Sequence, residues 1–166
     1  MKRFALYIII AVQIILLLAI VGKYQYMAAT GMPVTLRTSP VDPTDPFYGE
    51  YVTLRYEVNE LDRQQVKDQL TVDDQGKTVY VLVERSKHPW YDAAGVYRER
   101  PAAAANQALL RGRVQYIDQD RVYLTYGWER YYVAENTGRA IEQKENLLVD
   151  LRVMGSGEAI IERIRW

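Results

Sequence analysis

The chain of 166 residues is 49% hydrophobic and 25% charged, which is typical of a folded globular protein with one main domain. Lysine plus arginine and aspartate plus glutamate each number 21, so the basic excess of a nucleic-acid-binding protein is missing and we expect no nucleic-acid partner. The sequence has no cysteine and a single histidine, which excludes disulfides, thiol catalysis, cysteine-bound metals and multi-histidine metal sites. We therefore expect no metal and no cofactor.

Residues 4–21 form an apolar run that is interrupted only by Tyr7 and Gln13. As a helix the run would be about 27 Å long, close to the thickness of the hydrocarbon core of a bilayer. Two basic residues precede it and a single one, Lys23, follows closely, so the positive-inside rule places the N-terminus in the cytoplasm and the rest of the chain outside it. The segment predicts a single-pass anchor in the cell membrane.

Two other interpretations of this segment are open. A cleaved signal peptide would have a shorter apolar region and a small-x-small cleavage site, whereas the best site here, Ala28-Ala29-Thr30, ends in threonine. A buried core helix would need more surrounding chain than follows it. A lipoprotein anchor would need a cysteine, and the chain has none. We favour the uncleaved anchor.

These observations divide the chain into three parts. We expect an anchor in residues 1–23, a juxtamembrane linker in 24–33 and an extracytoplasmic β-rich domain in 34–166. From Tyr24 onward the chain has 18 basic residues against 21 acidic ones. Such a mildly acidic domain is not drawn to anionic lipid or nucleic acid by its net charge.

Strand signals follow the linker. Residues 34–37 predict a short strand among prolines, because proline disfavours helix at the residue before it. Every second residue from Val52 to Val58 is apolar, so residues 50–58 predict one half-buried strand. Residues 59–70 are polar with three spaced apolar positions and predict a short helix.

The rest of the chain continues as short strands joined by turns. The predicted elements are a strand at 77–84, a strand near 95–98, a hairpin of 113–117 with 121–126, a strand at 130–133, a short helix ending near 146, and a hairpin of 147–153 with 159–166. The strands come in runs and do not alternate with long helices. The predicted fold class is therefore mainly β: a transmembrane helix followed by an antiparallel β-sandwich or partly open barrel with one or two short helices.

One ordered set of motifs resembles a known bacterial family. The central segment is Gly49-Glu50-Tyr51-Val52-Thr53-Leu54-Arg55-Tyr56, preceded by Pro40-Val41-Asp42-Pro43. It resembles the family named for the motif GDYXXLXY, with Glu50 in place of Asp; the segments 110–114, 127–138 and 141–142 are also similar. The resemblance implies a membrane-anchored protein without an assigned activity, and members often accompany a polytopic membrane protein.

The residues around this motif are the first candidate site. We expect Asp42, Pro43, Asp45, Gly49, Glu50, Tyr51, Leu54 and Tyr56 to form a partner-binding motif. The carboxylates at 42, 45 and 50 could instead bind a cation such as calcium, but an aspartate directly before a proline is more typical of a turn. Alternation places Tyr56 in the core and Tyr51 on the opposite face of the strand, where it is the better candidate for an exposed contact.

An aromatic set is the second candidate site. Tyr126, Trp128 and Tyr131 belong to a group of aromatic residues on the central hairpins. Aromatic platforms can stack on sugars, which suggests an envelope glycan- or peptide-binding module as the alternative function. Tyrosine also suits half-buried sheet positions, so cross-strand packing is the competing interpretation.

The serine, lysine and histidine residues of the chain do not form a pattern typical of a catalytic site. A serine–lysine dyad would need Ser39, Ser86 or Ser156 beside a lysine in space, and Ser86 and Lys87 are neighbours that point apart on a strand. His88 precedes a proline in a predicted loop. We expect a membrane-anchored, non-catalytic domain that binds a polytopic membrane or envelope protein.

Overall fold

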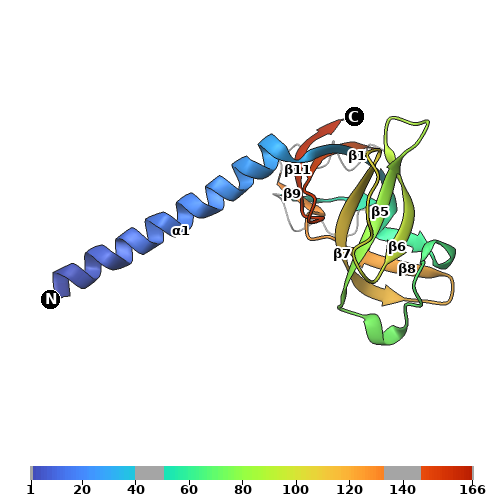
Figure 1. Cartoon of the computed structure of the whole chain (residues 1–166), viewed down its shortest axis with the longest axis horizontal. Coiled ribbons are helices and arrows are strands. Elements are labelled where there is room, and N and C mark those ends of the chain that lie inside the picture. The colour runs from blue at the N-terminus through green and yellow to red at the C-terminus, as the bar shows by residue number, and fades with distance from the viewer. Residues whose placement is uncertain (1, 40–50, 133–146, 166) are drawn as a thin grey trace.

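The computed structural model describes residues 2–39, 51–132 and 147–165. A long helix, α1 (Lys2–Thr30), projects from a body built of short strands (Figure 1). All pairings between the described strands are antiparallel. The fold is therefore mainly β with one N-terminal apolar helix, as the sequence predicts.

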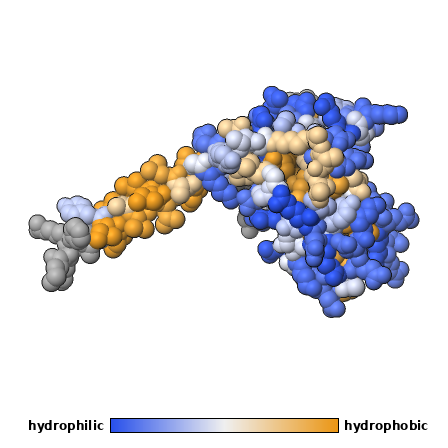
Figure 2. Space-filling view, in the orientation of Figure 1, coloured by the Kyte–Doolittle hydropathy of each residue, from blue (hydrophilic) through white to orange (hydrophobic). Residues whose placement is uncertain are grey.

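Helix α1 is long and apolar enough to cross a membrane by length and composition. Its 29 residues extend over about 43 Å. The large apolar side chains from Leu6 to Val21 are exposed and project away from the body. Figure 2 shows this apolar rod beside a face of the body that is mainly hydrophilic. The helix continues through Thr30, so the residues expected to form a linker are largely helical.

The strands divide into three sheets. Their bounds are β1 Met32–Ser39, β2 Tyr51–Thr53, β3 Arg55–Tyr56, β4 Glu60–Asp62, β5 Thr78–Arg85, β6 Tyr91–Tyr97, β7 Gln107–Ile117, β8 Arg121–Thr125, β9 Arg130–Tyr132, β10 Leu148–Val153 and β11 Ala159–Arg165. The largest sheet has the order β4-β8-β7-β5-β6, a second has the order β11-β10-β1-β3, and β2 pairs with β9. Three single-turn 3₁₀ helices connect them: η1 Glu57–Asn59, η2 Arg63–Gln65 and η3 Val72–Asp74.

The core lies between the two larger sheets. Alternate residues of the strands point inward, as period-2 geometry requires. Leu36 and Leu151 come from the four-stranded sheet, and Leu110 and Val81 from the five-stranded sheet; each is at most 1% exposed. Tyr56, at the end of the motif strand, is fully buried among them.

Two predicted elements were wrong in detail. The strand predicted over 50–58 is broken into β2, β3 and η1, because the chain changes its pairing partner at Leu54: β2 pairs with β9, whereas β3 pairs with β1. The helix predicted over 59–70 is absent. Leu61 pairs with Val122 in the β4–β8 ladder instead, so tertiary pairing overrides a weak local signal.

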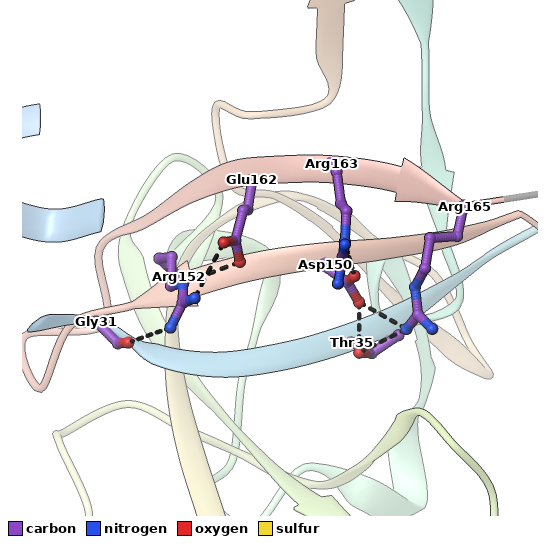
Figure 3. Close-up of polar contacts among 7 residues, drawn as sticks. All are labelled: Gly31, Thr35, Asp150, Arg152, Glu162, Arg163 and Arg165. Atoms are coloured by element: carbon purple, nitrogen blue, oxygen red, sulfur yellow. Dashed lines mark hydrogen bonds and ion pairs between the residues drawn. The ribbon is translucent and has the colours of Figure 1, made fainter. Parts of the chain in front are cut away.

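The junction between helix and body is tight. Only Gly31 separates α1 from β1, and a Cβ atom there would lie 2.6 Å from the Met27 carbonyl oxygen and 2.9 Å from the Cβ of Arg152. Arg152 donates to the Gly31 carbonyl at 3.4 Å and binds both carboxylate oxygens of Glu162, as Figure 3 shows. Met27 is 4% exposed. The helix is thus docked on the β10–β11 hairpin.

A polar cluster joins three of the four strands of this sheet, β1, β10 and β11 (Figure 3). Asp150 on β10 accepts hydrogen bonds from Thr35 on β1 at 2.7 Å, and from Arg163 and Arg165 on β11 at 2.8 and 2.7 Å. Burial alone raises the pKa of Asp150, but the hydrogen bonds from Arg163, Thr35 and Arg165 outweigh it and lower the pKa. The carboxylate therefore stays ionised and holds the C-terminal strand in register.

The tight β10–β11 turn generates the first prediction. Gly157 and Gly127 have φ of +87° and +88°, but only at Gly157 would a Cβ meet other atoms, the Cβ and backbone nitrogen of Arg111, both at 2.9 Å. We expect Gly127→Ala to cost about 1 kcal/mol of unfolding free energy and Gly157→Ala at least about 2 kcal/mol more. Denaturant unfolding of the full chain in detergent, followed by tryptophan fluorescence, measures both; equal losses would contradict the packing at Gly157.

Candidate site at the helix–domain junction

The motif strand is fixed to the turn between β8 and β9. The register of β2 with β9 places Tyr51 opposite Tyr132 and Thr53 opposite Arg130. At the end of this ladder the Leu54 amide donates to the Glu129 carbonyl. The Leu54 side chain is 3% exposed. It therefore packs into the core and fixes the backbone of the motif strand at this point.

Glu129 organises the β8–β9 turn through its carboxylate. It accepts hydrogen bonds from the Gly127 amide at 2.7 Å, the Thr125 hydroxyl at 3.1 Å, and the Tyr126 amide. The side-chain amide of Asn59 donates to it at 3.2 Å. A carboxylate that receives several donors of one turn fixes the shape of that turn.

Asn59 links this turn back to the motif. Its amide oxygen accepts from the Tyr56 backbone at 2.7 Å, and its amide nitrogen donates to the Leu124 carbonyl at 2.8 Å. Sequence reasoning missed both Asn59 and Glu129 as structural centres. Their only signal was a polar residue next to an apolar alternation, which many exposed positions share.

Three aromatic rings connect the motif to the surface. Tyr56 meets Trp128 edge-to-face with ring centroids 4.6 Å apart, and Trp128 stacks on Tyr126 at 4.9 Å. The Tyr126 hydroxyl donates to the Val58 carbonyl at 2.7 Å. The Tyr56 hydroxyl is buried and has no hydrogen-bond partner in the part of the chain that the structure describes. Burial, and then the nearby charge of Glu129, raises the pKa of Tyr56, so the phenol is neutral.

The outer ring of this series lines a groove of about 660 Å³ between α1 and the domain. The predicted aromatic face, Tyr126, Trp128 and Tyr131, forms one wall. Lys23, Tyr24 and Met27 of α1 form another, and Ile160 and Ile161 of β11 contribute apolar surface. The structure thus brings the predicted aromatic residues together, beside a helix that sequence reasoning did not place there.

An ion-pair bridge closes one side of the groove. The Glu158 carboxylate lies 3.1 Å from the Lys23 amine and 2.9 Å from the Arg111 guanidinium. The hydrogen bond from Lys23 and the charges of Lys23 and Arg111 lower the pKa of Glu158. Glu158 therefore ties the last turns of α1 to both larger sheets.

The other predicted residues are placed as follows. Asp42, Pro43, Asp45, Gly49 and Glu50 lie outside the described residues, and Tyr51 begins β2. His88 stacks on Trp90 with ring centroids 4.6 Å apart, and the Arg37 guanidinium lies 5.1 Å from the Trp90 ring. Within the described ranges no group of three or more histidine or acidic residues could hold a metal ion.

The fold and this site define a β-rich domain that is carried on, and packed against, an apolar helix. The family model described as GDYXXLXY protein matches residues 13–164, which is most of the chain. The chain belongs to the GDYXXLXY family. Neither the comparison with curated proteins nor that with solved structures gave a match.

The tyrosine series generates the second prediction. Tyr56→Phe removes a buried hydroxyl that has no partner, so we expect the free energy of unfolding to stay the same or to rise by about 1 kcal/mol. Tyr126→Phe removes the hydrogen bond to Val58 and should lower the free energy by about 1 kcal/mol. Denaturant midpoints of the two variants test this. A large loss with Tyr56→Phe would show that its hydroxyl has a partner when the protein is folded in the membrane.

Proposed function

We propose that this protein is a single-pass membrane protein whose extracytoplasmic domain binds another integral membrane protein and has no catalysis of its own. The observation that carries the proposal is the junction at Gly31. An uncovered apolar helix passes into a central strand of the domain after a single residue, so the domain is held at a fixed height and orientation at the membrane surface.

The position of polar residues along α1 supports the membrane placement. The hydrocarbon core of a bilayer accommodates about 20 residues of helix. With residues 4–21 inside it, Lys23 and the exposed rings of Tyr24 and Tyr26 fall at the level of the lipid head groups. The basic residues before the run favour a cytoplasmic N-terminus and an external domain.

The charged clusters of the domain support a non-catalytic role. Asp74 accepts hydrogen bonds from the Thr71 amide and from Lys77, which lower its pKa to about 2, and it also pairs with Arg98 at 2.7 Å. Its ionised form is already satisfied by structural partners. Glu60 pairs with Arg55 and Arg121 in the same way. These ion pairs hold loops on the sheet, and they lower the pKa of both carboxyl groups away from neutral pH, where a general acid or base works best.

The beginning of the motif strand is the surface that we propose for the partner. Tyr51 begins β2, which pairs with β9, and Tyr131 of β9 lines the groove. With a photoreactive amino acid at position 51, we expect one dominant adduct with a polytopic protein in the membrane fraction, identified by mass spectrometry. The same probe at Val72, which is 71% exposed, is the control. Equal yields at both positions would contradict a specific partner surface.

Glycan or peptide binding is the second candidate function, favoured by the aromatic wall of the groove. Trp128 is held between Tyr56 and Tyr126, so it offers less free surface than an open stacking platform. Envelope binding that is lost in Tyr131→Ala and kept when position 51 is altered would support this candidate over a protein partner.

The orientation has its own test, because the chain has no cysteine. Ser156 lies exposed in the β10–β11 turn. We expect a Ser156→Cys variant to react in intact cells with a maleimide that does not cross the cytoplasmic membrane, after the outer envelope has been made permeable where one is present. Labelling after detergent lysis gives the total. Labelling only after lysis would contradict an external domain.

A further inference from the structure

Gln13 is a polar residue in the middle of the apolar helix. It lies near the centre of the run 4–21 and is exposed on the helix surface. Its side-chain amide has no hydrogen-bond partner among the described residues. If residues 4–21 span the hydrocarbon core, as the proposed function requires, this amide sits near the bilayer midplane.

An amide at that depth has no water to replace a missing partner, and leaving it unpaired is unfavourable. Polar side chains in transmembrane helices therefore face other helices and hydrogen-bond across the interface. Among the described residues the domain does not supply the partner, because its contacts with α1 lie near the C-terminal end of the helix, around Met27 and Gly31.

The face of α1 that carries Gln13 leads directly into the groove. Tyr24 follows Gln13 by eleven residues and Met27 by fourteen, which is about three and four turns of 3.6 residues. Both therefore lie on the Gln13 face, and both line the groove. Ile20, seven residues from Gln13, continues the same face and is 51% exposed. Gln13, Ile20, Tyr24 and Met27 thus form a stripe along α1. It runs from the side-chain amide near the midplane to the groove at the level of the lipid head groups.

We propose that this stripe binds a transmembrane helix of another integral membrane protein. That helix carries a hydrogen-bonding side chain near the midplane, which pairs with Gln13, and its external end seats in the groove. The proposal rests on the proposed function and names the surface that serves it inside the membrane.

The geometry argues against a second copy of this chain as the occupant. Met27 is 4% exposed because the domain covers it, so the domain lies on the same side of α1 as Gln13. In a symmetric pair with the two Gln13 faces together, both domains would project over the shared axis and compete for the same space. A transmembrane helix that carries no such domain can lie along the Gln13 face, beneath the domain of this chain.

The test compares two faces of α1 by photocrosslinking in native membranes. Leu17 lies one turn from Gln13 on the stripe and is 64% exposed; Ile15 lies on the opposite face and is 65% exposed. We expect a photoreactive residue at Leu17, and not at Ile15, to give an adduct whose peptide comes from a transmembrane segment of another protein. Gln13→Leu should lower the adduct yield about three- to thirtyfold, the range expected for one interhelical hydrogen bond.

A swapped variant is the matched control. Gln13→Ile combined with Ile15→Gln keeps the composition and hydropathy of the helix and moves the amide to the other face. We expect it to lose the Leu17 adduct as Gln13→Leu does. An adduct of two copies of this chain, equal yields from the two faces, or a yield that does not depend on Gln13 would overturn the proposal.

The probe at position 51, used in the same cells, separates this proposal from the proposed function. If position 51 captures a membrane protein and Leu17 does not, only the intramembrane contact fails. If neither captures one, or if the chain leaves the membrane in an alkaline wash, the proposed function fails with it.

Discussion

The rest of the structure depends on the direct connection between α1 and β1 through Gly31. β1 is a central strand, paired with β10 on one side and β3 on the other, so the end of the anchor is also part of the domain core. A side chain at position 31 would meet the Met27 carbonyl and Arg152. Because helix and strand are one continuous, packed segment, any tilt of the helix in a membrane is transmitted to the domain.

The groove is a consequence of this connection. It exists because the β8–β9 turn, the β10–β11 turn and the end of α1 meet at one place, where Glu158 bridges Lys23 and Arg111. Glu129 fixes the first of these turns, and Asn59 joins that turn to the family motif. The motif residues Leu54 and Tyr56 are buried in the core, and the tyrosine–tryptophan series that begins at Tyr56 ends in the wall of the groove.

The predicted elements that were right are those whose causes are local. The hairpin of β7 and β8 follows from Asp118, whose carboxylate accepts the amides of Asp120 and Arg121 within the turn itself. The helix predicted over 59–70 failed because Leu61 gains more from pairing with Val122, a contact that no window of sequence contains. The aromatic face was predicted by composition, but its packing on the motif was not.

The sequence by itself determined the apolar helix, the antiparallel β class and the family, because hydrophobic period, turn chemistry and an ordered motif are properties of short segments. Only the tertiary structure decided that the helix docks on the domain, that Glu129 and Asn59 support the motif, and that Gln13 shares a face with the groove. These features join residues that are tens of positions apart. Their stability comes from packing and desolvated hydrogen bonds, which exist only after the chain has folded.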